Sequence, residues 1–166
     1  MTGRALDVAA YRAILGGLAA PVTVVTAPAP DGPTGMTVSS FMSVSLAPPL
    51  VAVGLTVGKP TTAAVCTSER FAVNALGGDD AAIARRFAEI PSDQRFEGVS
   101  WTPGPQGIPV LLDVAATLCA GVVDVVAAGD HLVVLGSVVA AWDGHGPPLL
   151  RHASAYTRPE MVGSSS

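Results

Sequence analysis

The alternation of apolar and polar positions along this 166-residue chain predicts a fold built mainly from β-strands. Apolar and β-branched runs, each closed by a turn rich in proline, glycine or aspartate, are typical of strands. These runs span residues 22–27, 35–46, 50–57, 70–76, 110–126, 132–142 and 148–156. They follow one another at hairpin-like separations, without regular strand–helix alternation. This order favours an antiparallel barrel with peripheral helices over a doubly wound sheet.

Three shorter segments have the spacing or the end signals of helices. Asp7 can cap a first helix that runs to about Ala20 and carries one apolar face. That face is formed by Val8, Tyr11, Leu15 and Leu18. A second helix opens at 58–62, and a third spans 81–89. Residues 90–107 are rich in proline, glycine and polar side chains and predict a long loop, which in a compact domain often has a function or packs on a partner.

Residues 35–46 break the apolar pattern of the predicted strands. Five hydroxyl side chains stand there among apolar neighbours, namely Thr37, Ser39, Ser40, Ser43 and Ser45. A buried hydroxyl without a hydrogen-bond partner costs roughly 1–3 kcal/mol. Either the backbone or a bound ligand must therefore supply partners for these groups.

The composition is short of charge for a soluble monomer of this size, with 49% apolar residues, 13% charged residues and a mean hydropathy of +0.50. Membrane insertion and a large subunit interface are the two explanations. The longest apolar runs, such as 114–123, are far shorter than the roughly 20 residues that a spanning helix requires. A buried interface is the better explanation, and a homodimer is its commonest form.

Charge and targeting signals narrow the expected partners and location. The formal net charge is −4 and no basic patch is visible, so nucleic acid is not an expected partner. The N-terminus lacks a charged segment followed by an apolar one, and a cytoplasmic location is expected. We expect one domain over residues 1–158 and a disordered tail over 159–166. Cys66 and Cys119 are too few for a disulfide scaffold, and their apolar neighbours predict two buried side chains.

Common catalytic and phosphate-binding motifs are missing from the chain. The run Gly54–Lys59 is similar to a P-loop but is one residue short and is followed by Pro60. No G-x-G-x-x-G, H-E-x-x-H, C-x-x-C or G-x-S-x-G motif occurs, and the three histidines have no metal-ligand spacing. A Rossmann dinucleotide site, a hydrolase and a metal centre are therefore not expected.

Several short segments, considered in their order, resemble the flavin reductase-like family of FMN-binding split-barrel proteins. The resemblance extends from about Tyr11 to Tyr156, and the order and spacing of the segments make it specific although each segment is weak alone. The segments are Pro21–Thr26, Gly35–Thr37, Ser40–Phe41, Ser43–Leu46, Pro48–Leu50, Phe71–Asn74, Arg86–Phe87, Gly129–His131 and Pro148–Leu150. The resemblance implies an antiparallel split β-barrel with a few peripheral helices.

The same resemblance implies an activity. Members of this family carry hydride from NADH or NADPH to FMN or FAD, and many supply reduced flavin to a partner oxygenase. The chain is thus expected to be an NAD(P)H-dependent flavin reductase, the reductase component of a two-component flavin-dependent monooxygenase. Two alternatives stay open, because fold alone does not decide function. One is reduction of another acceptor, such as a cobalamin, a ferric chelate or a deazaflavin-linked system, and the other is flavin binding without turnover.

The resemblance also assigns residues to the cofactor site. Hydroxyl and backbone N–H groups of residues 35–46 would meet the edge of the flavin ring, and a helix start at 59–62 with a nearby arginine would bind its phosphate. The implied cofactor-binding residues are Thr37, Val38, Ser39, Ser40, Ser43, Ser45, Lys59, Thr61, Thr62, Asn74, Arg86, Phe87 and Tyr156. Asn74 either hydrogen-bonds the flavin or fixes the backbone, and Tyr156 packs against the ring or the partner subunit. His131, the implied catalytic residue, lies at the nicotinamide side and supplies positioning, charge or a proton.

Two departures from the family pattern bear on this site. Many members have asparagine where this chain has Ser39, which removes an amide from the expected flavin contact. Residues 151–154, which read Arg-His-Ala-Ser, replace a more usual run that contains an aromatic residue and glycine. We expect these departures to change the local flavin contact and the access or specificity for the nicotinamide.

Overall fold

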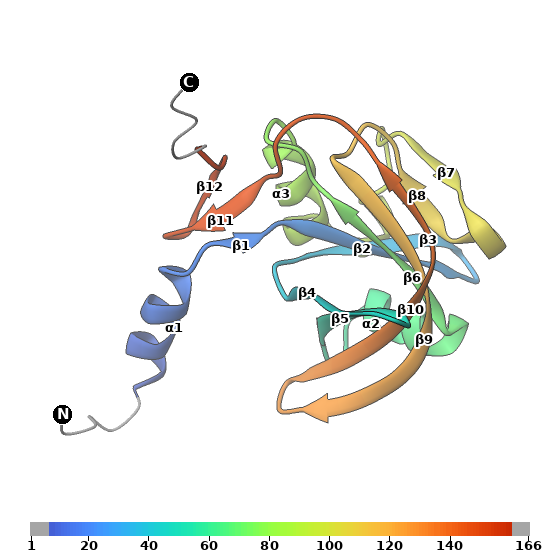
Figure 1. The fold of residues 1–166 in the computed structure, drawn as a ribbon, viewed down its shortest axis with the longest axis horizontal. Coiled ribbons are helices and arrows are strands. Elements are labelled where there is room, and N and C mark those ends of the chain that lie inside the picture. The colour runs from blue at the N-terminus through green and yellow to red at the C-terminus, as the bar shows by residue number, and fades with distance from the viewer. Residues whose placement is uncertain (1–6, 161–166) are drawn as a thin grey trace.

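The computed structural model describes residues 7–160 and confirms the predicted antiparallel β architecture (Figure 1). The helices are α1 (Val8–Gly16), α2 (Pro60–Ser68) and α3 (Ala81–Glu89), with 3₁₀ turns at Ser92–Gln94 and Pro105–Gly107. The strands are β1 (Ala20–Pro21), β2 (Thr23–Ala29), β3 (Gly32–Val38), β4 (Phe41–Leu46), β5 (Pro49–Thr56), β6 (Arg70–Ala75), β7 (Trp101–Pro103), β8 (Pro109–Leu111), β9 (Ala116–Ala128), β10 (His131–Asp143), β11 (Leu150–His152) and β12 (Ala155–Thr157). No helix within these residues has the length and apolar character needed to cross a membrane.

Seven strands form one curled antiparallel sheet, in the order β3-β2-β6-β9-β10-β5-β4. Its two edge strands, β3 and β4, are consecutive in the sequence and are joined only by Ser39 and Ser40. The sheet therefore closes like a barrel, but no hydrogen-bonded ladder joins β3 to β4. This seam is the split of the predicted split barrel, and the chain crosses it at the two serines.

The inside of the curled sheet is a packed apolar core. Val25, Val53 and Phe71 come from three different strands and are fully buried, and Val65 of α2 packs against them. A β-carbon on Gly136 would lie 2.6 Å from the Phe71 ring, so this glycine lets β10 pass close to the aromatic side chain. The core thus follows the inward positions of the alternating strands, as the pattern of the sequence predicts.

A second apolar cluster lies under α3. Phe87 of α3 is fully buried in it with Val24 and Leu76, and Leu149 joins from the segment before β11. α3 therefore covers part of the sheet and holds the C-terminal β11–β12 hairpin near the split. The hairpin completes a small three-stranded sheet in the order β1-β11-β12.

Three predicted strands are divided in the structure, each at residues with an identifiable backbone reason. The run 35–46 becomes β3 and β4 because the chain turns at the split. The run 110–126 divides into β8 and β9, with Asp113 in the left-handed region (φ 58°) between them. The run 148–156 is a hairpin whose turn residues, Ala153 and Ser154, both have positive φ (49° and 62°). The predicted loop 90–107 contains β7 and two 3₁₀ turns.

The predicted N-terminal helix is present as α1, but none of its side chains is buried against the rest of the chain. Asp7 caps it as predicted, accepting a hydrogen bond from the Ala9 N–H at 3.1 Å. The helix ends at Gly16, earlier than expected, because two glycines with low helix propensity follow each other there. None of its residues is buried, and its predicted apolar face leaves Val8 63% exposed. Figure 1 shows α1 standing away from the sheet.

Candidate functional site at the split of the barrel

The split brings Ser40, Gly54 and His131 together on the outer face of the sheet. The Ser40 hydroxyl donates to the Gly54 carbonyl at 2.6 Å and accepts from the Gly54 N–H at 3.1 Å, so it acts as a strand partner at the seam. A β-carbon on Gly54 would lie 3.1 Å from Cβ of Ser40 and 4.0 Å from Cδ2 of His131. Because Gly54 has no side chain, only its backbone lies between Ser40 and His131, and we call this part of β5 the Gly54 strip. A flat ring can lie against such a surface.

His131 begins β10, directly after a turn in which Gly129 has a left-handed conformation (φ 65°). Its Nδ1 lies 2.7 Å from Oδ1 of Asp130, and its Nε2 lies 3.2 Å from Oγ1 of Thr56, the residue opposite it on β5. Nδ1–H can donate to the carboxylate, and Nε2 shares a hydrogen bond with the threonine hydroxyl in which either group can be the donor. The imidazole is thus oriented by two partners while its side chain stays 42% exposed.

Asp130 is the charged partner of this histidine. Its hydrogen bond with His131, and then the charge of His131, hold the pKa of the Asp130 carboxyl below its usual value, and Arg12 of α1 adds a smaller effect in the same direction. The carboxylate therefore stays ionised at neutral pH and keeps the imidazole oriented.

Ser39 lines a surface cavity next to the seam. This cavity of about 210 Å³ lies between the end of α1 and the β11 strand. It is lined by Leu15, Gly16, Leu18, Ala20, Ser39 and Arg151. Arg151 in turn lies against the ring of Tyr156, with 5.6 Å from Cζ to the ring centre, and Arg85 of α3 lies 5.4 Å from the same centre. Arg151 therefore borders the cavity that Ser39 lines and also lies against Tyr156.

The hydroxyl-rich segment divides into groups with and without protein partners. Thr37 donates to the Ala84 carbonyl at 2.7 Å and ties β3 to α3, and Ser45 accepts from the Ala47 N–H at 3.3 Å in the β4–β5 turn. Val38 points into the core and is buried. Ser39 and Ser43 are exposed, and no hydrogen bond to their hydroxyl groups is found within residues 7–160. These two hydroxyls are the ones that remain available to a ligand.

The predicted phosphate site at the start of α2 is mostly occupied by protein contacts. Thr61 is fully buried and shares a hydrogen bond of 3.0 Å with Thr34, while Thr62 donates to the Thr56 carbonyl at 2.7 Å. Both hydroxyls therefore seat α2 against the sheet. Lys59 is the N-cap residue of α2, is exposed and makes no side-chain cap bond. It borders a surface cavity of about 370 Å³ that also contains exposed Cys66, contrary to the expectation that both cysteines are buried.

Asn74 has all four of its amide hydrogen-bonding positions engaged by protein groups. Its Nδ2 donates to the Val24 carbonyl at 2.9 Å and to Oγ1 of Thr26 at 3.1 Å. Its Oδ1 accepts from the Leu111 N–H at 2.9 Å and from the Thr117 hydroxyl at 3.4 Å. Asn74 is completely buried, so of its two expected roles the structure shows the one that fixes the backbone.

Arg86 and Phe87 also serve the framework. The Arg86 guanidinium donates from Nε to the Arg95 carbonyl at 2.8 Å and from Nη2 to the Gln94 carbonyl at 2.7 Å. It thus holds the chain that follows α3, instead of facing the Gly54 strip. Phe87 is completely buried, and a β-carbon on Gly35 would lie 2.8 Å from its ring. Phe87 therefore offers no free surface to a cofactor, and two of the three guanidinium nitrogens of Arg86 are engaged by the protein.

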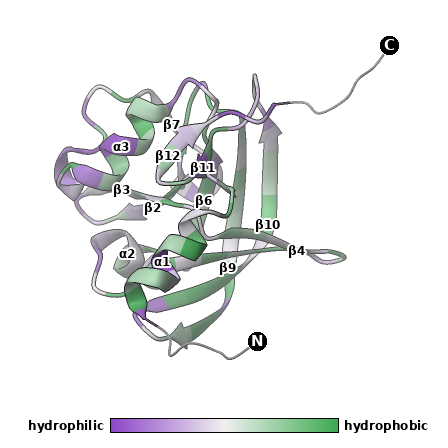
Figure 2. Cartoon of the chain, turned by 90° about the vertical axis from the view of Figure 1, so that its left-hand side faces the viewer, coloured by the Kyte–Doolittle hydropathy of each residue, from purple (hydrophilic) through white to green (hydrophobic). Residues whose placement is uncertain are grey.

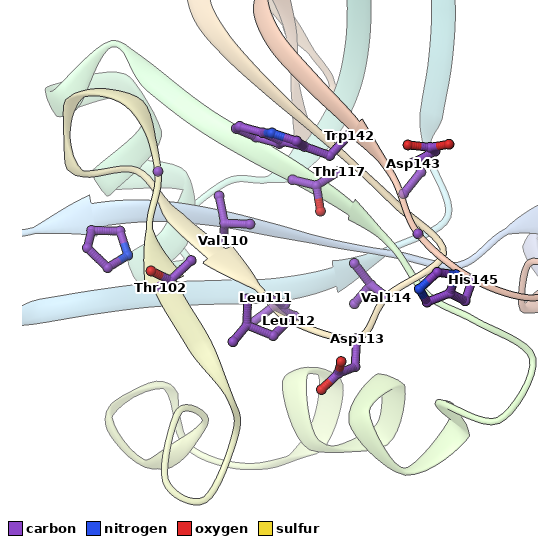
Figure 3. Close-up of a pocket in the computed structure, with 14 residues that line it drawn as sticks. Thr102, Val110, Leu111, Leu112, Asp113, Val114, Thr117, Trp142, Asp143 and His145 are labelled. Carbon is purple, nitrogen blue, oxygen red and sulfur yellow. The ribbon is translucent and has the colours of Figure 1, made fainter.

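A cavity of about 430 Å³ lies at the opposite end of β10 from His131 (Figure 3). Figure 3 shows the indole of Trp142 on one side, Leu111 and Leu112 on the other, and Asp143 and His145 toward one end. None of the residues predicted for the cofactor site lines it. Across residues 7–160, no three histidine, cysteine, aspartate or glutamate side chains gather so that they could hold a metal ion.

Several residues at the split were not predicted from the sequence. Gly54 and Thr56 belong to a continuous apolar strand, and only the pairing of β5 with β10 brings them beside His131. Asp130 was not predicted as a site residue, although its bond to His131 is the one expected of neighbouring aspartate and histidine side chains at a turn. Arg85 had no signal, because its position on α3 relative to Tyr156 depends on how the helix packs.

Comparisons with known proteins find one matching family and several similar proteins. The flavin reductase like domain family matches residues 15–160. The chain is 43% identical over 133 residues to a flavin reductase (NADH) of Kitasatospora aureofaciens. The aligned region covers 78% of this chain and 69% of that protein. It is 37% identical over 141 residues to the stachydrine N-demethylase reductase subunit of Rhizobium meliloti, covering 84% of this chain and 61% of that protein. Among solved structures, the NADH:FAD oxidoreductase of Streptomyces globisporus C-1027 has a TM-score of 0.88 at 29% identity, covering 97% of this chain and 100% of that one.

Some relatives are considerably longer than this chain. The chain spans 53% of the length of one curated relative and 61% of another.

Proposed function

The chain belongs to the flavin reductase like domain family, and from this membership and the geometry at the split we propose that it is an NAD(P)H-dependent flavin reductase. It would carry a hydride from NADH or NADPH to FMN or FAD. The observation that carries the proposal is the Gly54 strip, with the Ser40 hydroxyl at one side and an oriented His131 at the other. Two flat rings that must stack at reacting distance need such a surface, because a projecting side chain would separate them.

The residues present fit a flavin at this place. Gly54 lacks the side chain that would fill the strip, and the hydroxyls of Ser39 and Ser43 are available for the polar edge of a ring. Hydride transfer between nicotinamide and flavin is chemistry that the two cofactors supply when bound. The protein's part is to align the rings and to place a proton or charge, and His131 would do the second because Asp130 and Thr56 fix the orientation of its ring.

The direct test is to mix the purified protein with FMN and NADH and to follow the nicotinamide absorbance, then to repeat it with FAD and with NADPH. We expect oxidation that depends on added flavin. Flavin binding without oxidation of either nicotinamide would contradict the proposal and favour a flavin-binding module. Oxidation that occurs only when a cobalamin or a ferric chelate is supplied would favour the other acceptor.

The role of His131 has its own test. In His131→Ala we expect flavin affinity to stay within about twofold and nicotinamide-dependent reduction to fall at least tenfold, because an oriented proton donor or charge near the reacting rings is lost. His145→Ala is the matched control, since His145 lines the remote cavity. If His131→Ala loses flavin affinity while turnover per bound flavin is unchanged, the histidine binds the cofactor and does not act on the nicotinamide.

We also propose that the protein is a homodimer, because its exposed apolar surface needs a cover. On α1, Tyr11 and Leu15 are each 46% exposed, and on β4 Leu46 is 90% exposed. Figure 2 shows further apolar residues, in green, along the β9–β10 hairpin, where Val123 is 59% exposed. A second copy of the chain is the simplest cover, since most oligomers are symmetric homodimers.

Sedimentation analysis of the protein tests the dimer. We expect a dimer at micromolar concentration, and the double change Leu15→Glu with Tyr11→Glu should shift it toward monomer because it places two charges on the apolar face of α1. Val57→Glu, which changes an exposed valine beside Lys59, is the control for added charge. A wild-type protein that sediments as a monomer at all concentrations would contradict the proposal.

The expected recipient of reduced flavin is a flavin-dependent monooxygenase in the cytoplasm. Similarity to the reductase subunit of a demethylase supports a two-component arrangement. The test is to supply a candidate oxygenase with flavin reduced by this protein and to measure substrate oxidation. Capture of the partner from the native cell, with fractionation of the same lysate, would identify the recipient and the compartment together.

A further inference from the structure

Two arginines converge on one tyrosine beside the split. The Cζ atoms of Arg85 and Arg151 lie 5.4 and 5.6 Å from the centre of the Tyr156 ring. Arg151 is paired with Tyr156 across the β11–β12 hairpin, whereas Arg85 comes from α3. The ring packs against the apolar cluster under α3. It is therefore a fixed platform against which both guanidinium groups rest.

These two charges have no acidic partner in the part of the chain that the structure describes. The ion pairs there join His131 to Asp130 and Arg158 to Asp79. Two like charges near one ring repel each other, and a bound anion offsets this repulsion. This local positive charge contrasts with the net charge of the whole chain, which is −4. The arrangement therefore calls for an anionic ligand.

The arginine pair is continuous with the candidate flavin site. Arg151 lines the same 210 Å³ cavity as Ser39, and Ser39 directly precedes Ser40 at the Gly54 strip. A nucleotide whose ring lies on the strip can therefore extend past Ser39 toward the two guanidinium groups. Arg86, the arginine expected to bind phosphate, is engaged by two carbonyl groups of the following loop. Arg151 adds a positive charge at the Ser39 cavity, where neither Arg86 nor Lys59 is a lining residue.

We propose that Arg85 and Arg151, supported by Tyr156, bind a phosphate or pyrophosphate group of a nucleotide that enters the split, an inference that rests on the proposed reductase function. A guanidinium fork matches two phosphate oxygens at once, which lysine cannot do. The phosphate belongs either to the flavin nucleotide or to the nicotinamide dinucleotide, since both carry one. The substitution of residues 151–154 noted in the sequence thus has a chemical consequence, because it introduces Arg151.

The first arm of the test needs no turnover. Inorganic pyrophosphate is titrated against the wild type, Arg85→Gln, Arg151→Gln and the double variant, and the melting temperature is followed. We expect stabilisation of the wild type that is reduced in each single variant and lost in the double variant. Arg158→Gln is the matched control, because it also removes one positive charge but from an arginine that pairs with Asp79. Arg151→Lys should retain part of the stabilisation.

The second arm identifies the owner of the phosphate. Riboflavin and FMN differ only by a phosphate, so an affinity for FMN that falls about tenfold in Arg151→Gln while riboflavin binding is unchanged assigns the site to the flavin. A KM for NADH that rises about tenfold with unchanged kcat and unchanged FMN affinity assigns it to the nicotinamide dinucleotide.

The outcomes separate this inference from the proposed function. If the wild type reduces flavin but pyrophosphate stabilises the double variant as well as it does the wild type, the anion site is wrong and the reductase stands. Equal loss of riboflavin and FMN binding would also overturn it, because the arginines would then only support Tyr156. If the wild type oxidises neither nicotinamide, the reductase proposal fails, and the pyrophosphate titration still decides whether the two arginines bind an anion.

Discussion

The polar groups buried between β2, β6 and β9 and those at the split between β3 and β4 are of similar chemical kinds, but different partners satisfy them. In the interior, the Asn74 amide is saturated by four protein groups, and Thr61 is bonded to Thr34. At the split, the Ser40 hydroxyl satisfies the N–H and the carbonyl of half-buried Gly54, and the Ser39 hydroxyl has no protein partner within residues 7–160. We call these the interior network and the rim.

The difference shows what a polar residue in an apolar run can and cannot indicate. Its burial demands a hydrogen-bond partner, and the protein itself is the commonest source of one. In the interior network every demand is met by neighbouring strands, so the network stabilises the barrel. At the rim the seam leaves groups unpaired and leaves room beside them, so that is where a ligand can bind. Substitutions in the interior network should therefore lower stability, and substitutions at the rim should lower binding or turnover.

Asn74→Ala should lower the free energy of unfolding by about 3 kcal/mol or more, because it leaves several buried donors and acceptors without partners. Denaturant titration followed by fluorescence measures the loss. Ser43→Ala at the rim is the comparison and should change stability by less than about 0.5 kcal/mol. If the Asn74→Ala protein has normal stability but no longer binds flavin, Asn74 contacts the ligand and is not part of the interior network.

Gly54→Val should weaken FMN binding by at least tenfold, about 1.4 kcal/mol. The new side chain fills the Gly54 strip and presses on Ser40, since even a β-carbon would lie 3.1 Å from Cβ of that residue. Gly121→Val is the matched control on β9, where an added β-carbon meets nothing within 4 Å. Equilibrium titration of flavin fluorescence distinguishes them, and unchanged binding in Gly54→Val would place the flavin elsewhere.

The neighbouring arginines of α3 should separate stability from binding. Arg86→Gln removes two hydrogen bonds to the Gln94 and Arg95 carbonyls and should cost about 1–2 kcal/mol of stability. Arg85→Gln should change stability by less than about 0.5 kcal/mol. Thermal or denaturant unfolding of both proteins provides the measurement. A reversed order would show that Arg85 belongs to the framework and would leave Arg86 as the freer charge.

Thr56→Val should lower nicotinamide-dependent turnover by about three- to tenfold, because it removes the hydroxyl that holds Nε2 of His131 while keeping nearly the same volume. Thr56→Ser restores the hydroxyl and should recover most of the rate. Flavin affinity should stay within about twofold in both. Equal losses of rate in the valine and serine variants would show that the threonine acts through its methyl group and packing.

The thiols of Cys66 and Cys119 should differ in their accessibility to reagents, although each has an apolar neighbour in the sequence. Burial raises the pKa of the Cys119 thiol to about 11, so at pH 8 it is both protonated and shielded. Cys66 is exposed on α2. A thiol reagent at pH 8 should therefore modify Cys66 alone in the native protein and both residues after unfolding. Modification that persists in Cys66→Ser would reveal opening of the β6–β9 core.

Local features of the fold could be predicted because they depend on neighbours in the sequence. The Asp7 cap forms as expected, and the turns at 28–33 and 127–131 join antiparallel strands. The family resemblance pointed to His131 at a turn, where the structure places it beside an open strip. Pro60 in the first turn of α2 likewise matches its fixed backbone angle.

Contacts across the sheet and between helix and hairpin could not be predicted in this way. Arg85 and Arg86 are adjacent in sequence and equal in chemistry, yet α3 directs one to Tyr156 and the other to the following loop. Thr56 meets His131 only through the register of β5 against β10. A single-residue shift of that register would send Thr56 to the other face of the sheet.

The sequence by itself determined that this chain makes antiparallel strands, where most of them turn, and that the hydroxyls of residues 35–46 require partners. Hydropathy, turn residues and the hydrogen-bonding capacity of each side chain act over a few residues, so they are present in any conformation of the chain. Only the tertiary structure decided that the sheet splits at Ser39 and Ser40, that Asn74 is saturated and that two arginines meet on Tyr156. Each of these depends on segments distant in sequence, because strand register and helix packing set which polar groups find a protein partner and which are left for a ligand.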